Sequence, residues 1–303
     1  MRSNNSFKPS PLRGSACVPA LRLHAFAATA RAGLTQVLGP LSRLQVIRLI
    51  LTAILLVACT TVHADETVPA ALSPAAEAAE IASAQTVGSA IYLHDQAASV
   101  ATDAVLGVPR FKQDKRVKGW VTEQQGADIV VTFFNSTPAA IYRVVVSNGK
   151  AGPVTALDAP VPLTAYEAGA AQARAVAAAS QFEPCSSNYN SVVLPGKSPA
   201  EDWVVYLLPG TTKNNVVPIG GTYRFSVKSS RVVSQRGFTR TCIALATDPR
   251  AEALMITHLL DPVPTEAHVF WSLWAGKPIY VATPPAGTIW AVQGDKIRLV
   301  ERK

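Results

Sequence analysis

Residues 119–149, GWVTEQQGADIVVTFFNSTPAAIYRVVVSNG, decide the fold that the sequence predicts. The stretch contains three runs rich in β-branched and aromatic residues, and the polar turns QGAD and STP separate them. In the middle run both alternating faces are apolar, which is typical of a central strand that a helix covers on one side. We therefore expect a β-meander with strands at Gly119–Gln124, Ile129–Asn135 and Ala140–Ser147.

One helix is expected before this meander and another after it. Residues 70–106 are rich in alanine and predict a helix that could divide at Gly88-Ser89. Residues 151–162 hold three prolines and indicate a linker, and residues 163–181 are again alanine-rich and predict the second helix. Nine more β-rich runs follow, at Ser191–Leu194, Trp203–Leu208, Gly221–Lys228, Arg231–Leu245, Leu254–Leu260, His268–Trp274, Pro278–Thr283, Thr288–Val292 and Lys296–Val300.

This succession predicts an α+β fold made of two helix-plus-antiparallel-meander units. The first unit spans residues 65–150 and the second spans residues 163–303, after an N-terminal leader at residues 1–64. The chain is 49% hydrophobic and 16% charged, which excludes an extended disordered protein. No G-X-Y period or heptad array is present, so the sequence also excludes the fibrous classes.

The formal net charge of +8 belongs almost entirely to the leader. Residues 1–64 contain seven basic residues and no acidic residue, so the remaining chain carries 21 bases against 20 acids. A nearly neutral globular part lacks the basic surface that binds phosphate backbones. We therefore do not expect a nucleic-acid partner.

An uncharged run at residues 49–62, LILTAILLVACTTV, predicts the h-region of a signal peptide. Fourteen residues are too few to cross a bilayer as a helix, which needs about 20. Cleavage after Ala64 fits signal peptidase I, and the alternative is a lipobox, LVAC, that would place a lipidated Cys59 at the mature N-terminus. The expected location is the periplasmic or extracellular side of the envelope, with membrane contact only if Cys59 is lipidated.

The h-region begins unusually far into the chain. Signal-peptide n-regions are short, so translation starting at Val46 would give a typical leader. The alternative is a long n-region or a targeting extension.

The expected export of the protein determines how we interpret its four cysteines. Cys17 and Cys59 lie in the leader, so Cys185 and Cys242 are the two thiols of the mature chain. Two thiols in an oxidising compartment usually pair, and a bridge across this separation would stabilise by roughly 4 kcal/mol. The sequence therefore predicts a Cys185–Cys242 disulfide, with a reactive cysteine as the alternative.

A basic region lies between Trp203 and Thr247, which contains six basic residues and no acidic one. Strand alternation at 223–228 points Arg224 and Lys228 to the same face, and Arg231 follows in the next strand. This face predicts a binding surface for an anionic envelope component, either a lipid head group or a glycan. The alternative is a solvated sheet face or an edge that its charges protect.

Residues 258–268, HLLDPVPTEAH, group two histidines with two carboxylates around two prolines. If the flanking strands form a hairpin, a His–Glu pair at its mouth is the expected outcome. Imidazole and carboxylate are also zinc ligands, so a metal site is the less ordinary alternative. Its ligands would be His258, Asp261, Glu266 and His268.

No catalytic motif accompanies these residues: the sequence lacks G-x-S-x-G, a Walker loop, G-x-G-x-x-G, C-x-x-C and H-E-x-x-H. We therefore expect an exported envelope protein that acts as a non-catalytic binding or scaffolding module without a cofactor. The competing hypothesis is a hydrolase, with or without a metal, centred on residues 258–268. The ligand and the oligomeric state do not follow from the sequence.

Overall fold

A computed structural model describes residues 68–109, 111–197, 202–211, 213, 215–248, 250–285 and 287–302. These residues belong to one compact unit. The leader lies outside the described residues, and with it the h-region at 49–62, the start at Val46, the cleavage site at Ala64, and Cys17 and Cys59. Within the described part of the chain, no helix is long and apolar enough to cross a membrane.

Helix α2 (Pro74–Leu106) is one continuous helix, so the division that we considered at Gly88-Ser89 is absent. Ser73 caps its first turn by accepting a hydrogen bond from the backbone N–H of Ala76 at 3.3 Å. Gly88 is needed for close packing, because a Cβ there would lie 2.5 Å from the Cβ of Val269. The glycine thus lets a second helix approach α2.

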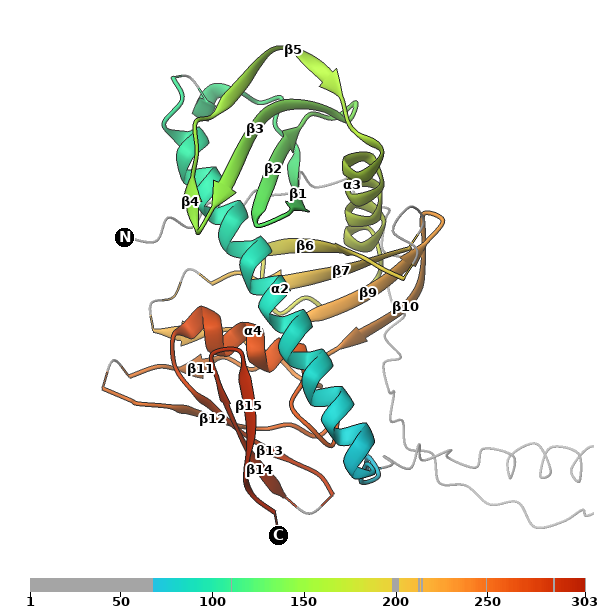
Figure 1. The fold of residues 1–303 in the computed structure, drawn as a ribbon, viewed down its shortest axis with the longest axis vertical. Coiled ribbons are helices and arrows are strands. Elements are labelled where there is room, and N and C mark those ends of the chain that lie inside the picture. Colours follow the sequence, from blue (N-terminus) through green and yellow to red (C-terminus); the bar gives the residue numbers. More distant parts are fainter. Residues whose placement is uncertain are drawn as a thin grey trace, which may run out of the picture. The chain divides into compact units, whose positions relative to one another are not determined.

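The N-terminal sheet contains the expected meander (Figure 1). Its strands β1 (Gly119–Gln125), β2 (Asp128–Phe134) and β3 (Ala139–Ser147) pair antiparallel. The segment expected to be a linker instead forms β4 (Lys150–Ala151) and β5 (Thr155–Pro162), which both pair with β3. Its prolines are compatible with a strand because β5 is an edge strand, where a missing N–H is tolerated. A short 3-10 helix, η1 (Phe111–Gln113), precedes the sheet.

The middle sheet has the strand order β10-β9-β7-β6 and is antiparallel. Helix α3 (Ala165–Ala178) packs on one face, and α2 and α4 pack on the other. A small pair, β8 (Val216–Val217) with β11 (Leu245–Ala246), stands apart from it. The long strand expected at 231–245 ends at Gly237. The bounds of the four main strands are β6 Tyr189–Pro195, β7 Asp202–Pro209, β9 Tyr223–Lys228 and β10 Arg231–Gly237.

The C-terminal sheet corrects one sequence prediction. Residues 268–274, expected as a strand, belong to helix α4 (Glu266–Ala275). Its start is capped, since the backbone N–H of Thr265 donates to His268 Nδ1 at 3.0 Å, and it ends at Gly276 in the left-handed conformation. Helix α4 connects the parallel strands β12 and β13, and β14 then pairs antiparallel with both β13 and β15. The bounds are β12 Leu254–Thr257, β13 Ile279–Thr283, β14 Thr288–Gln293 and β15 Lys296–Glu301.

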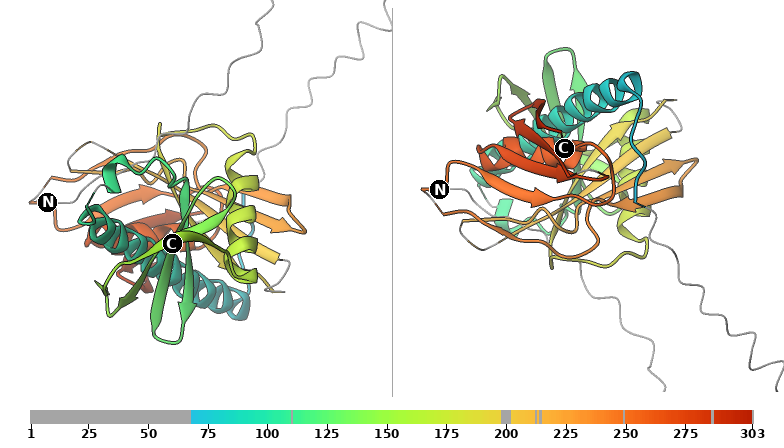
Figure 2. Two further views of the ribbon diagram at one scale, coloured as in Figure 1. Left: turned by 90° about the horizontal axis from the view of Figure 1, so that it is seen from above. Right: turned by 90° about the horizontal axis from the view of Figure 1, so that it is seen from below.

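Helix α2 joins these layers. It contacts β3 of the N-terminal sheet, β6 of the middle sheet and α4, and it crosses all of them in Figures 1 and 2. The expected boundary at residues 151–162 therefore does not separate two cores. The fold is α+β with mostly antiparallel sheets.

Candidate functional site

A row of polar side chains crosses the middle sheet on the face that carries α4. Tyr206, Arg224 and Arg236 are cross-strand neighbours on β7, β9 and β10. Strand alternation places the apolar neighbour Phe225 on the opposite face, beneath α3. The two arginines therefore lie side by side under the segment that leads into α4.

Two carboxylates from that segment neutralise the two arginines. Arg224 Nη1 lies 2.8 Å from Glu266 Oε1, and the Tyr206 hydroxyl donates to the same oxygen at 3.1 Å. Arg236 binds both oxygens of Asp261, at 2.5 and 3.2 Å. Phe238 lies beneath both guanidinium groups, whose Cζ atoms are 5.9 and 4.8 Å from its ring centroid.

Two buried histidines complete the cluster. His258 Nε2 lies 2.8 Å from Asp261 Oδ2, and the rings of His258 and His268 meet edge to face at 4.6 Å. Burial alone would raise the pKa of Asp261, but hydrogen bonds from His258 and Arg236 hold that pKa well below its usual range. Burial lowers the pKa of His268, so its ring is neutral and accepts the Thr265 N–H. We refer to Tyr206, Arg224, Arg236, Phe238, His258, Asp261, Glu266 and His268 as the arginine cluster.

The arginine cluster brings together the two sequence features that seemed separate, but not in the expected arrangement. No hairpin forms at 258–274, and the expected His–Glu pair is wrong because Glu266 pairs with Arg224. Within the described chain, no group of three or more His, Cys, Asp or Glu residues could hold a metal ion. The donor set does not fit a metal, since arginines bind both carboxylates and Thr265 occupies His268 Nδ1.

The other predicted cations share the face of Arg224. Lys228 forms an ion pair with Asp202 at 3.2 Å, although 58% of its side chain is exposed. Arg231 lies opposite Lys228 in the β9–β10 pair and is exposed. Lys228 and Arg231 are therefore the more exposed of the three predicted binding residues, whereas Arg224 is partly buried in its ion pair with Glu266.

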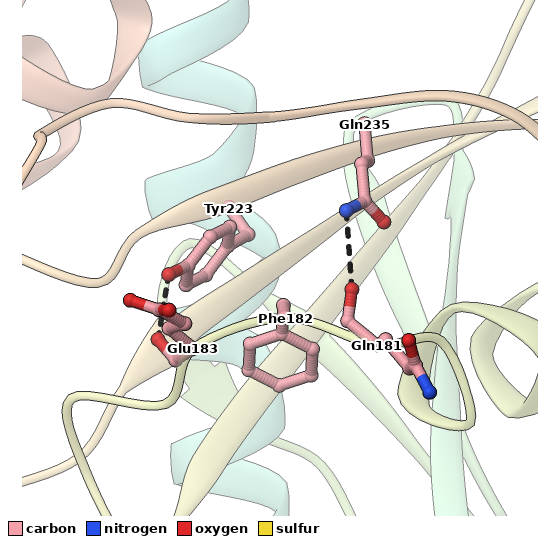
Figure 3. Close-up of a pocket in the computed structure, with 5 residues that line it drawn as sticks. All are labelled: Gln181, Phe182, Glu183, Tyr223 and Gln235. Atoms are coloured by element: carbon pink, nitrogen blue, oxygen red, sulfur yellow. Dashed lines mark hydrogen bonds between the residues drawn. The ribbon is translucent and has the colours of Figure 1, made fainter. Parts of the chain in front are cut away.

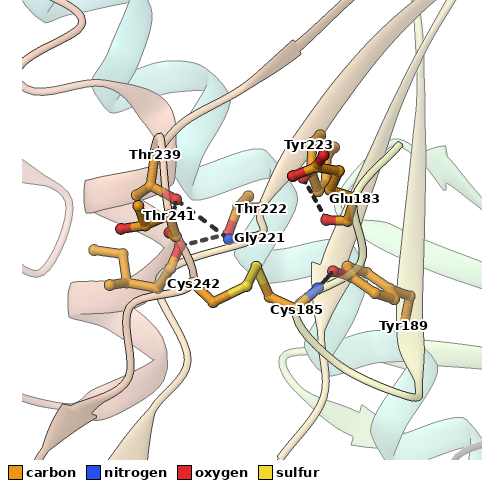
Figure 4. The surroundings of a disulfide bond; sticks show 10 residues. Glu183, Cys185, Tyr189, Gly221, Thr222, Tyr223, Thr239, Thr241 and Cys242 are labelled. Atoms are coloured by element: carbon orange, nitrogen blue, oxygen red, sulfur yellow. Dashed lines mark hydrogen bonds between the residues drawn. A yellow bond between two sulfur atoms is a disulfide. The ribbon is translucent and has the colours of Figure 1, made fainter. Parts of the chain in front are cut away.

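The predicted disulfide is confirmed: Cys185 and Cys242 are bonded, with Cα atoms 5.3 Å apart (Figure 4). Gly220 and Gly221 create the space for it. A Cβ on Gly221 would lie 2.5 Å from the Cβ of Cys185, and one on Gly220 would collide with the backbone of Ile243. Gly221 also has a φ of +84°.

A shallow, open depression of about 440 Å³ lies beside the disulfide, and sequence reasoning missed it. Figure 3 shows Tyr223 and Gln235, from neighbouring strands, reaching the segment that follows α3. Tyr223 donates to the carbonyl of Glu183 at 2.6 Å and Gln235 donates to that of Gln181 at 3.1 Å. With Phe182 these residues form an aromatic, amide-rich lining that contains a carboxylate and no cation.

Two ionisable residues are buried side by side in the middle of α2. His94 Nδ1 lies 2.7 Å from Thr122 Oγ1, and the neighbouring Asp95 is only 7% exposed. Burial lowers the pKa of His94 to about 4 and raises that of Asp95 to about 6. The carboxyl receives only two long hydrogen bonds, of 3.3 Å each, from Asn190 and Gln96. Neither group therefore has a counter-charge among the residues that the structure describes.

Comparisons with known proteins add no family: no family model, curated protein sequence or solved structure matches the chain.

Proposed function

We propose that this is an exported protein of the cell envelope that acts as a non-catalytic binding or scaffolding module. The observation that carries the proposal is the pairing inside the arginine cluster. Asp261 and Glu266 are bound by Arg236 and Arg224 at 2.5 to 2.8 Å, so neither is a carboxylate free to take a proton from a substrate. These side chains support the alternative role of fastening the segment before α4 to the middle sheet. Nothing in the described chain favours a hydrolase.

The Cys185–Cys242 disulfide supports the location, because structural disulfides persist in oxidising compartments. We place the mature protein on the periplasmic or extracellular side of the envelope, either released by cleavage after Ala64 or anchored through Cys59. N-terminal sequencing of the mature protein distinguishes the two forms, since the first residue is Asp65 in one and a lipidated Cys59 in the other. A mature protein that still begins upstream of residue 49 would contradict export.

The proposed partner is an anionic envelope component, a glycan or a lipid head group. The exposed side chains of Lys228 and Arg231 support it, since they lie next to each other where β9 turns into β10. The binding test is cosedimentation of the mature protein with peptidoglycan and, separately, with phosphatidylglycerol vesicles.

We expect retention on one of the two materials, and we expect the Lys228→Gln/Arg231→Gln variant to lose most of it. Lys296→Gln is the matched control, because Lys296 is also an exposed lysine with one carboxylate partner, Asp295 at 3.1 Å. Equal retention of all three proteins, or retention of none on either material, would contradict this partner.

A further inference from the structure

Arg174 differs from the arginines of the cluster because it lies where the N-terminal and middle sheets meet. It extends from α3 toward β1 and β6, which contact each other at their edges. Its Nε donates to Ser191 Oγ at 2.7 Å, and its Cζ lies 5.4 Å from the centroid of the Trp120 ring. Arg174, Trp120 and Ser191 thus come from three elements and meet at one place.

These donors lack acceptors. Among the described residues no carboxylate lies within ion-pair distance of Arg174, and its Nη1 and Nη2 have no hydrogen-bond partner. Trp120 Nε1 is also buried, and it has no hydrogen-bond partner among the described residues. Burial lowers the pKa of Arg174, yet a guanidinium keeps its charge at any ordinary pH. The Arg174 side chain is only partly buried, so its unpaired N–H donors are open to water and to an acceptor from outside the chain.

Gly119, the first residue of β1, lets the guanidinium pack directly against the backbone of this strand. A Cβ at this position would lie 2.8 Å from Arg174 Nη1 and 2.9 Å from Phe134 Cζ. Any other residue would therefore press on the group that carries the unpaired donors.

In a second arginine–tryptophan contact of the same chain, both the guanidinium and the indole N–H have acceptors. Arg302 Cζ lies 5.9 Å from the centroid of the Trp290 ring. There the guanidinium binds Glu77 at 2.7 Å, and Trp290 Nε1 donates to Thr283 Oγ1 at 3.0 Å. The Arg174 contact has the same stacking but lacks both acceptors.

We propose that Arg174 and Trp120 bind an oxyanion, a phosphate or carboxylate group, which goes beyond the binding function proposed above. The flat guanidinium presents parallel N–H donors that match two oxygens of such a group. The indole N–H beside it supplies a further donor.

The test is a titration of the mature protein with sodium phosphate and, in parallel, with sodium acetate. Sodium chloride at equal ionic strength is the reference, and unfolding temperature and tryptophan fluorescence are recorded. A 100-fold excess of bound anion over its Kd raises the unfolding temperature by roughly 5–10 °C for a chain of this size. We expect this shift with phosphate, acetate or both, and no such shift with chloride.

Variants separate site binding from general salt effects. Arg174→Gln should lose the specific shift, and Trp120→Phe, which keeps the ring but removes the N–H, should weaken the anion Kd several-fold. Arg302→Gln is the matched control and should keep the full shift. If Arg174→Gln does not fold, Trp120→Phe alone decides. Equal shifts in chloride and in the oxyanions, or an unchanged response of the Arg174→Gln or Trp120→Phe protein, would overturn the proposal.

Discussion

The arginine cluster and the surroundings of Arg174 differ in how the charge of a guanidinium group is balanced. In the cluster, Arg224 and Arg236 each bind a carboxylate that the segment before α4 supplies. Within the described chain, Arg174 donates a hydrogen bond to Ser191 and stacks on the face of Trp120, and it has no carboxylate partner. A cluster of paired charges fastens two parts of a fold together, whereas an unpaired guanidinium is available to a ligand.

The buried pair in α2 shows why Arg174 is a special case. Asp95 and His94 also lack counter-charges, but each can become neutral, and their pKa values are shifted in that direction. A guanidinium has no neutral form in this pH range. Of these three groups, only Arg174 therefore keeps a charge that a ligand of opposite charge can neutralise.

The largest expected effect on stability concerns the Cys185–Cys242 disulfide. Replacing Cys185 and Cys242 together by serine should lower the free energy of unfolding by about 4 kcal/mol, because the open chain gains loop entropy. Urea denaturation of the two proteins measures this difference. If the loss is below about 1 kcal/mol, the bridge does not constrain the unfolded chain as the separation of 57 residues implies.

The next largest effect on stability comes from the buried carboxyl group of Asp95. Because the pKa of Asp95 is raised to about 6, its contribution to stability is fully present below pH 3.8 and is lost as the pH rises through 6. At pH 7.5 the ionised carboxyl then costs about 3 kcal/mol. Asp95→Asn should therefore be more stable than the wild type at pH 7.5 by up to that amount, and equal to it at pH 3.5.

The contribution of His94 to stability changes with pH in the opposite direction to that of Asp95, over nearly the same pH range. Its pKa is lowered to about 4, so its contribution is present above pH 6.5 and is lost as the pH falls toward 4. Between pH 4 and 6 the two slopes largely cancel in the wild type. Unfolding of Asp95→Asn across this range should reveal the fall in stability that His94 causes, and a flat profile would contradict it.

Removing one charge of the arginine cluster should lower the free energy of unfolding by a smaller amount. Arg224→Gln leaves Glu266 with only the Tyr206 hydroxyl, and breaking a fully buried pair costs 3–5 kcal/mol. Since 37% of the Arg224 side chain is exposed, we expect a loss of about 2 kcal/mol. The Arg224→Gln/Glu266→Gln double variant should recover part of it, whereas Lys228→Gln, at an exposed ion pair, should cost less than about 0.5 kcal/mol. Additive losses in the double variant would show that the pair is not coupled.

The sequence predicted local structure best where one pattern dominates. Alternating apolar residues at 119–147 placed three strands correctly, and the compartment argument paired Cys185 with Cys242. The helix at 266–275 was missed because its residues are buried almost all round, which hides the helical period. Its signals were a Thr265–His268 cap and Gly276, and histidine at that capping position is less familiar than glutamate.

The partners within the site could not be predicted in the same way. Arg224 and Glu266 are 42 residues apart, and they meet only because α4 crosses the middle sheet. Likewise, nothing local to Arg174 shows that no carboxylate reaches it. Pairing of charges is a tertiary property, so the sequence identified Arg224, His258, Asp261, Glu266 and His268 as notable but did not predict that Arg224 pairs with Glu266 and His258 with Asp261.

The contrast between paired and unpaired arginines is tested most directly by unfolding Arg174→Gln and Arg224→Gln side by side in urea, at pH 7.5, with chloride as the only small anion. Arg224→Gln is predicted to lose about 2 kcal/mol, whereas Arg174→Gln is predicted to change by less than about 0.5 kcal/mol, because it removes a charge that no protein group balances. A loss in Arg174→Gln equal to or larger than that in Arg224→Gln would contradict the distinction between the two sites.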